Sequence, residues 1–149
     1  MKTCSDVMTQ DVIFAVPGET VDTVAKLMKN NDIGPIPIVQ DANSKKLVGI
    51  VTDRDLVLKV LAEGRDARNT RIEEIMTKSL VTCRETDNLD VALKTMSANQ
   101  VRRIPVVNKH NQIVGIIAQA DVALLGQSPL KTGEIVEDIS KPEIARTGR

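Results

Sequence analysis

One short segment brings together side chains that could bind a phosphate and a sugar. It reads Gly49-Ile50-Val51-Thr52-Asp53-Arg54-Asp55, and its apolar first half predicts a strand that leads into a helix. Thr52 and Asp55 have the spacing of a capping box, in which both side chains accept hydrogen bonds from N–H groups at a helix start. The same position favours a phosphate, because free N–H groups and the positive end of the helix dipole face outward there. A carboxylate can also accept from both hydroxyls of a ribose, so the capping and the binding interpretations both stay open.

The segment has a second copy, and the two copies differ at the hydroxyl. Gly115-Ile116-Ile117-Ala118-Gln119-Ala120-Asp121 keeps the glycine and the last carboxylate but has Ala118 in place of Thr52. Without the hydroxyl, a capping box loses half of its hydrogen bonds. A carboxylate near a helix start is still favourable by itself. The second copy therefore favours ligand binding without excluding a structural role.

A pair of arginines is the second candidate group. Arg102 and Arg103 stand immediately before the apolar residues 104–107. Two guanidinium groups at the entrance of a strand suit an anion, because their fixed donor forks can grip phosphate oxygens. The alternative is a solvated surface pair. The matching positions of the first copy are Gly34 and Pro35, so a basic phosphate clamp would exist in one copy only.

These segments belong to a longer internal repeat. Val7-Met8-Thr9 returns 68 positions later as Ile75-Met76-Thr77, and Ile36–Val39 returns at the same displacement as residues 104–107. The glycine-to-aspartate segment returns after 66 positions, so the first copy has two extra residues, which we place in a turn. Because a module of roughly 60 residues buries a marginal core alone, the duplication indicates two modules that need each other.

Apolar periodicity predicts the same elements in both copies. An extended stretch precedes a helix whose apolar side chains recur at i, i+3, i+4 and i+7, with Thr20 and Asn88 as candidate N-caps. Two strands then form a hairpin, and a second helix closes each copy. The extended stretches are 12–16 and 80–83; the hairpin strands are 36–39 with 47–51 and 104–107 with 113–117.

The predicted order is β-α-β-β-α, twice, which is an α+β fold. We expect a first domain at residues 1–64, a connector at 65–72, a second domain at 73–128 and a partly disordered tail at 129–149. The connector is polar and contains a glycine, as is typical of a link between two packed modules.

Composition excludes several classes of function. Twenty basic and twenty acidic residues cancel, and Phe14 is the one aromatic residue, so neither a basic field nor stacking platforms support nucleic-acid binding. No apolar run approaches the roughly 18 residues of a membrane span, and we expect a cytoplasmic protein. His110 has no second histidine with which to bind a metal, and no phosphate-binding loop or nucleophile motif is present, so we expect neither a metal site nor an enzyme.

The two cysteines leave one question open. Cys4 and Cys83 lie in different copies without metal-ligand spacing. A disulfide is possible, whereas reduced thiols are the usual state in the cytosol. The sequence does not decide their redox state.

Taken together, these residues resemble a tandem pair of CBS domains, the family named after cystathionine beta-synthase. The resemblance rests on Asp6-Val7-Met8-Thr9, the two Ile-Pro strands and the two glycine-to-aspartate junctions, and it covers about residues 5–127. It implies two β-α-β-β-α motifs packed as a pseudo-twofold pair, as in a small stand-alone prokaryotic CBS protein. No catalytic residue, metal or required cofactor is implied.

The resemblance also implies a ligand and its contacts. Such pairs commonly bind AMP, ADP, ATP or S-adenosylmethionine in clefts between the repeats, and they often form disc-like homodimers. Asp55 and Asp121 would hold the ribose of the two clefts, Thr52 would contact phosphate or ribose in the first, and Arg102 and Arg103 would meet phosphates. The base would lie against Ile50, Val81 and Thr82 in the first cleft and against Ile116, Ile13 and Phe14 in the second.

The function expected from the sequence is therefore a regulatory module. It would sense adenosine-containing ligands, and with them the energy state of the cell, and signal to a partner protein that the sequence does not identify. The alternative is a dimerisation or scaffold protein with vestigial clefts, because Ala118 lacks the hydroxyl and Gly34-Pro35 lacks a basic side chain.

Overall fold

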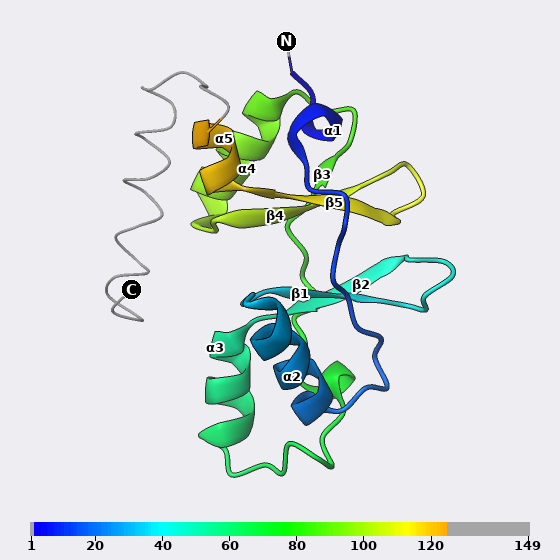
Figure 1. Cartoon of the computed structure of the whole chain (residues 1–149), viewed down its shortest axis with the longest axis vertical. Helices are drawn as coiled ribbons and strands as arrows, with labels where there is room; N and C mark the ends of the chain where they lie inside the picture. Colours follow the sequence, from blue (N-terminus) through cyan, green and yellow to red (C-terminus); the bar gives the residue numbers. More distant parts are fainter. Residues whose placement is uncertain (1, 125–149) are drawn as a thin grey trace. The chain divides into compact units, whose positions relative to one another are not determined.

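The computed structural model describes residues 2–124 and confirms the mixed α+β class (Figure 1). It contains a two-stranded sheet with the order β1-β2 and a three-stranded sheet with the order β3-β4-β5. Short helices accompany both sheets. The tail predicted at 129–149 and the last residues of the predicted second domain lie outside the described residues.

The chain divides into two compact units that do not follow the repeat order. Unit 1 holds the described residues up to Val12, then Val81–His110, then the described residues from Val114 onward. Unit 2 holds Ile13–Leu80 and Asn111–Ile113. The first residues of the chain therefore pack with the strands of the second copy, whereas the second Met-Thr segment, Met76-Thr77, stays with the strands of the first.

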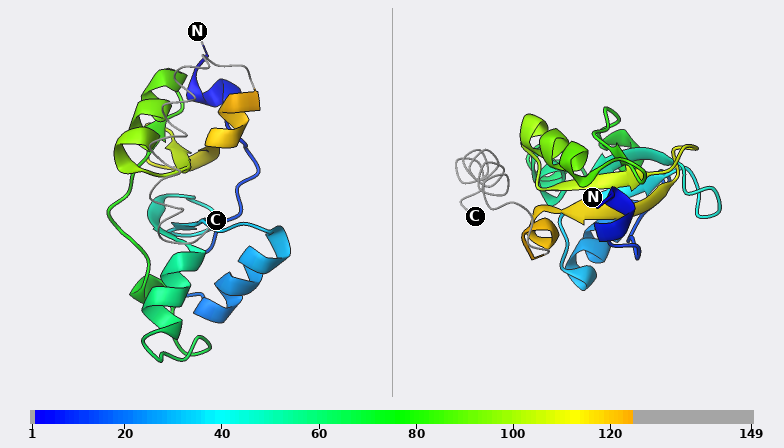
Figure 2. Two further views of the ribbon diagram at one scale, coloured as in Figure 1. Left: turned by 90° about the vertical axis from the view of Figure 1, so that its left-hand side faces the viewer. Right: turned by 90° about the horizontal axis from the view of Figure 1, so that it is seen from above.

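Unit 2 is built on an antiparallel hairpin. β1 (Ile36–Val39) pairs with β2 (Leu47–Val51), with Ile36 opposite Val51, which confirms the predicted pair of strands. α2 (Val21–Asn31) precedes the hairpin, and α3 (Asp53–Leu56) follows it and continues as a π-helix, η1 (Val57–Leu61). A 3-10 turn, η2 (Ile72–Glu74), comes before the segment that leads to unit 1. Figures 1 and 2 show α2 and α3 on one face of this hairpin.

Unit 1 repeats this plan with one more strand. β3 (Cys83–Arg84) runs parallel to β4 (Arg103–Val107), and β5 (Ile113–Ala118) is the other neighbour of β4. α4 (Leu89–Asn99) stands between β3 and β4 in the chain, and α5 (Gln119–Leu124) follows β5. The chain begins with a four-residue helix, α1 (Cys4–Val7).

Apolar side chains form a separate core in each unit. In unit 2, the inward face of α2 packs with β1, β2 and η2. In unit 1, α1 and α4 pack with β3, β4, β5 and α5. The buried face of α4 consists of Leu89, Ala92, Leu93 and Met96, the i, i+3, i+4, i+7 stripe that the sequence predicts.

Some local predictions were wrong in detail. The extended stretch at 12–16 is no strand, because Ala15 makes only an isolated parallel bridge with Ile38; its counterpart at 80–83 is reduced to β3. Thr20 and Asn88 do occupy the N-cap positions, but neither side chain accepts a capping hydrogen bond. The Thr20 hydroxyl donates to Asp22 instead, and its oxygen accepts no hydrogen bond from the backbone N–H groups of the first turn.

Candidate functional site

The Thr52–Asp55 pair forms a complete capping box at the start of α3. The Asp55 N–H donates to the Thr52 hydroxyl oxygen at 3.2 Å, and the Thr52 N–H donates to Asp55 Oδ2 at 2.9 Å. The structural interpretation of this motif is therefore correct. It does not exclude binding, because each carboxylate oxygen can accept more than one hydrogen bond.

A lysine one turn later lies beside the same carboxylate. Lys59 Nζ lies 3.4 Å from Asp55 Oδ1 and also donates to the backbone carbonyl of Ile75 at 3.0 Å. The Asp55 side chain is 19% exposed, so solvent or a ligand can reach it. Asp55 is thus held from two sides, by its own helix start and by a lysine that is itself anchored.

The residue before β1 lies close to the start of α3 in unit 2. A Cβ placed on Gly34 would lie 3.2 Å from Asp53 Oδ1, so residue 34, just before β1, approaches the first residue of α3. The residues Gly34, Thr52, Asp53 and Asp55 therefore lie at one end of the hairpin, which we call the unit 2 edge. Its polar groups are one hydroxyl and two carboxylates.

The equivalent end of the unit 1 hairpin has different side chains. β5 ends at Ala118, and the Gln119 N–H donates to the carbonyl of Arg102 at 2.8 Å, which ties the start of α5 to the entrance of β4. Asp121 lies in the first turn of α5, two residues after that bond. We call Arg102, Arg103, Ala118 and Asp121 the unit 1 edge. The hairpin brings the two arginines and Asp121 to the same end, where Arg103 is exposed and Arg102 and Asp121 are half-buried.

The motif glycines are explained by methionines rather than by a ligand. A Cβ on Gly49 would lie 2.5 Å from Met76 Sδ, and a Cβ on Gly115 would lie 2.5 Å from Met8 Sδ. Both glycines are buried. The repeated methionine and the repeated glycine thus form a packing pair in each unit, and each glycine pairs with the methionine of the other copy.

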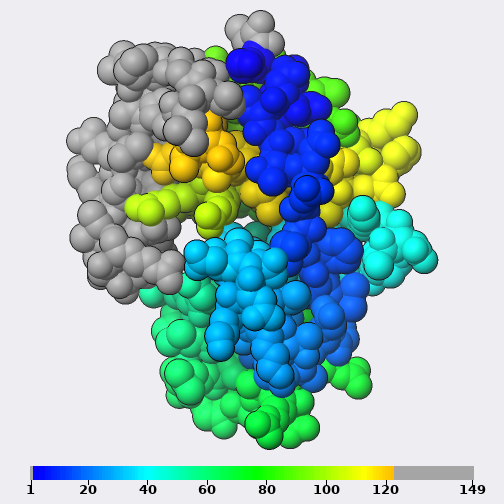
Figure 3. All heavy atoms as spheres, in the orientation of Figure 1, coloured from blue at the N-terminus to red at the C-terminus, as the bar shows by residue number. Residues whose placement is uncertain are grey.

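Backbone pairing also restricts what Ile50 and Ile116 can offer a ligand. Ile50 exchanges hydrogen bonds with Thr77 at 3.0 and 2.9 Å, and Ile116 exchanges them with Thr9 at 3.0 and 2.8 Å. Figure 3 shows the N-terminal residues lying against β5. The backbone N–H and C=O of both isoleucines already bond to these threonines, so contact with a base would come mainly from their half-buried side chains.

The opening segments fall into different units from their predicted partners. Val81 and Thr82 are half-buried in unit 1, where Val81 packs against the core, whereas Ile50 belongs to unit 2. Ile13 and Phe14 are half-buried in unit 2, whereas Ile116 belongs to unit 1. The predicted grouping of these residues around a base therefore stays a prediction.

The described part of the chain holds neither a metal-binding cluster nor a membrane-spanning helix. Within residues 2–124, no three His, Cys, Asp or Glu side chains are grouped so that they could hold a metal ion. None of the helices in that range has the length and hydrophobicity needed to cross a membrane.

Comparison with known proteins identifies the repeat. The family model "CBS domain" matches residues 4–62 and 72–126. The CBS domain-containing protein YhcV of Bacillus subtilis is 35% identical over 144 residues, which are 97% of this chain and 99% of that protein.

Solved structures agree with the sequence comparison. The CBS domain pair of protein MJ0100, in complex with 5′-methylthioadenosine and S-adenosyl-L-methionine, has a TM-score of 0.70 and 32% identity and covers 84% of this chain and 95% of its own. CBSX2 in complex with AMP has a TM-score of 0.71 and 26% identity and covers 84% of this chain and 96% of its own. With two family matches, a full-length relative and these structural neighbours, the chain belongs to the CBS-domain family as a CBS pair.

Proposed function

We propose that this protein is a regulatory module that binds an adenosine-containing ligand and passes a change in shape or assembly to a partner protein. The ligand would be AMP, ADP, ATP or S-adenosylmethionine, and the protein would act in the cytoplasm as a homodimer without catalysing a reaction. The observation that carries the proposal is the Asp55 carboxylate, which is fixed at a helix start and still partly exposed.

The chemistry of the unit 2 edge suits a ribose. A carboxylate whose position is fixed loses little conformational entropy when it accepts hydrogen bonds from two neighbouring hydroxyls. The Thr52 hydroxyl uses its oxygen as an acceptor for the Asp55 N–H, so its own hydrogen can be donated to a ligand oxygen.

The chemistry of the unit 1 edge suits phosphate. Arg102 and Arg103 supply the paired guanidinium groups, and Asp121 supplies the carboxylate equivalent to Asp55. The two structural neighbours whose complexes contain AMP, or methylthioadenosine with S-adenosylmethionine, support an adenosine ligand for this chain.

A thermal-shift screen with AMP, ADP, ATP and S-adenosylmethionine tests the proposal. A ligand that binds the folded state raises the melting temperature, by several degrees at a concentration about 100 times its Kd. Asp55→Asn keeps an oxygen that can accept from the Thr52 N–H but removes the charge, so we expect the shift to shrink without loss of the fold.

The chain offers a matched control for that variant. Thr3 and Asp6 have the same spacing at α1, and the Thr3 N–H donates to Asp6 Oδ2 at 2.9 Å as the Thr52 N–H does to Asp55. Asp6→Asn should leave the ligand-induced shift unchanged. No shift with any of the four ligands at millimolar concentration, or equal losses in both variants, would contradict the proposal.

An exposed apolar surface favours the alternative of a scaffold. Val57, Leu58 and Leu61 of η1 are 51%, 46% and 75% exposed, although side chains of this type are usually buried. A scaffold would use such a surface for assembly and would not need the carboxylates. If Leu61→Lys abolishes self-association while Asp55→Asn and Asp121→Asn change neither assembly nor partner capture, the scaffold explanation is correct.

A further inference from the structure

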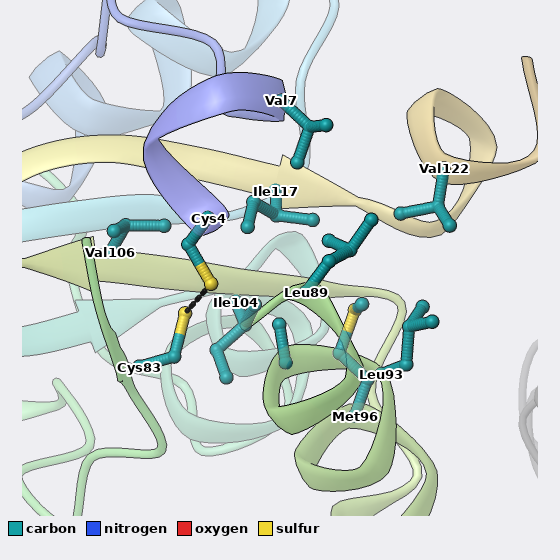
Figure 4. Close-up of a cluster of buried hydrophobic side chains, with 11 residues drawn as sticks. Cys4, Val7, Cys83, Leu89, Leu93, Met96, Ile104, Val106, Ile117 and Val122 are labelled. Atoms are coloured by element: carbon teal, nitrogen blue, oxygen red, sulfur yellow. Dashed lines mark hydrogen bonds between the residues drawn. The ribbon is translucent and has the colours of Figure 1, made fainter. Parts of the chain in front are cut away.

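The two cysteines of the chain meet inside unit 1. Cys4 Sγ and Cys83 Sγ lie 3.5 Å apart, although the residues are 79 positions apart in the sequence. Both side chains are buried, and Figure 4 shows the two sulfur atoms pointing at each other from α1 and β3. They form part of the unit 1 core, together with Leu89 and Val106.

The segment that carries Cys4 is short, and residues 2–9 make five backbone hydrogen bonds to the other described residues of unit 1. α1 has four residues, and its first two N–H groups donate to the loop after β3, Cys4 to the carbonyl of Asp87 at 2.9 Å and Ser5 to that of Glu85 at 3.0 Å. Four residues later, Met8 packs on Gly115. A four-residue helix that lies outside the sheet and buries two side chains is expected to open locally more often than the sheet opens.

We propose that Cys4 and Cys83 form a reversible disulfide that fastens α1 to β3. A disulfide needs a sulfur separation of about 2.05 Å, so the sulfurs must approach by about 1.5 Å for the bond to form. The bond would close a loop that contains most of the described chain, and a long loop gives a large loss of entropy in the unfolded state.

The reaction requires a small-molecule disulfide, for which glutathione disulfide is the natural example. When α1 opens, the Cys4 thiolate attacks one sulfur of glutathione disulfide, whose S–S bond breaks and releases a glutathione thiolate. The Cys83 thiol then gives up its proton and attacks the Cys4 sulfur, which releases the second glutathione. Two protein thiols are oxidised and one disulfide is reduced to two thiols, so atoms and electrons balance.

The environment of the two thiols assigns their order of reaction. The hydrogen bond with Cys83 lowers the pKa of Cys4, whereas the same interaction, with burial, raises the pKa of Cys83. Opening of α1 breaks that hydrogen bond, so the order follows from access: the opening segment brings Cys4 to the disulfide first, and Cys4 is the attacking group. Cys83, within β3, is the resolving group.

Incubation of the full-length chain in buffers with an increasing ratio of glutathione disulfide to glutathione tests the proposal. After alkylation in denaturant, mass spectrometry should find a species that is unalkylated and lighter by two hydrogens, with Cys4 and Cys83 in one linked peptide that a reductant separates. The oxidised protein should melt roughly 5–10 °C higher than the reduced protein. Hydrogen exchange should slow at the amides of Cys4 and Ser5 and stay the same at Val21, which belongs to unit 2.

Single-cysteine variants separate this bond from other oxidation products. Cys83→Ala should accumulate a glutathione adduct on Cys4, with no rise in melting temperature. The proposal is wrong if wild-type protein collects glutathione on both cysteines without linking them, if the link forms only in denaturant, or if the linked protein melts and exchanges like the reduced one.

Discussion

The unit 2 edge and the unit 1 edge occupy equivalent ends of two repeated hairpins, yet they carry different polar side chains. The unit 2 edge has the Thr52 hydroxyl and two carboxylates, with Gly34 where an arginine could stand. The unit 1 edge has two arginines and Asp121, with Ala118 where the hydroxyl could stand. A carboxylate in the first helical turn is the group that both copies keep.

This difference teaches that the duplicated motif has two separate constraints. The glycines are required by packing against Met8 and Met76, independently of any ligand. The carboxylates Asp55 and Asp121 recur in different hydrogen-bonding surroundings, since only Asp55 has a hydroxyl partner three residues earlier. A group that persists when its structural partner is lost is the better candidate for binding.

The largest expected effect concerns the two packing pairs. Gly115→Ala should lower the free energy of unfolding by about 3 kcal/mol and Gly49→Ala by about 1–2 kcal/mol, because overpacking of this kind costs about 1–3 kcal/mol. At Gly115 the added carbon would also meet Met8 Cβ at 2.9 Å, which side-chain rotation cannot move away, whereas at Gly49 the nearest atoms belong to the outer part of Met76. Urea unfolding measures both. Equal losses would show that the two pairs are not packed differently.

A second pair of variants exchanges the hydroxyl between the edges. Thr52→Ala should lower the free energy of unfolding by about 1 kcal/mol, since it removes a cap. Ala118→Thr should raise it by about 0.5–1 kcal/mol, because the new hydroxyl stands three residues before Asp121 and can complete a capping box. Chemical denaturation of both variants gives the comparison. If Ala118→Thr lowers the free energy of unfolding, the unit 1 edge cannot form the capping box that Thr52 and Asp55 form in unit 2.

The smallest expected effect concerns the lysine beside Asp55. Lys59→Met should lower the free energy of unfolding by about 0.5–1 kcal/mol, because it removes a partly exposed ion pair and the bond to the Ile75 carbonyl. Lys26→Met is the matched control: Lys26 lies 4.0 Å from Asp22 at the same i,i+4 spacing and is 74% exposed. Its loss should be at most about 0.3 kcal/mol. If the two variants lose the same free energy of unfolding, Lys59 does not anchor Asp55.

Sequence patterns predicted the elements of this fold better than their assembly. The hairpin β1–β2 is confirmed residue for residue, because buried strands next to a polar turn leave a local signal. The assignment of the first twelve residues to the unit of the second copy depends on pairing between Thr9 and Ile116, which are far apart in the chain and leave no local signal. The approach of Cys4 to Cys83 could not be predicted for the same reason.

The candidate site shows a similar division. The spacing of Thr52 and Asp55 was enough to predict their hydrogen bonds, because a capping box is a local structure. The anchoring of Asp55 by Lys59 was not predicted. It depends on the bond from Lys59 to the carbonyl of Ile75, which lies sixteen residues further along the chain. The role of the glycines was also missed, because their partners come from the other copy of the repeat.

The most direct test of the account is isothermal titration of AMP into wild-type protein and into Asp55→Asn and Asp121→Asn variants. Hydrogen bonds to a charged group contribute about 1.5–3 kcal/mol, so removal of the charge at a ribose should weaken binding by roughly 10- to 100-fold. Because the two edges differ in hydroxyl and arginine content, we expect the two variants to lose affinity for AMP unequally. If a carboxylate holds the ribose, its replacement should weaken the binding of 2′-deoxy-AMP less than it weakens the binding of AMP. Equal losses in both variants, or unchanged affinity in both, would contradict the claim that the two edges contribute differently to adenosine binding.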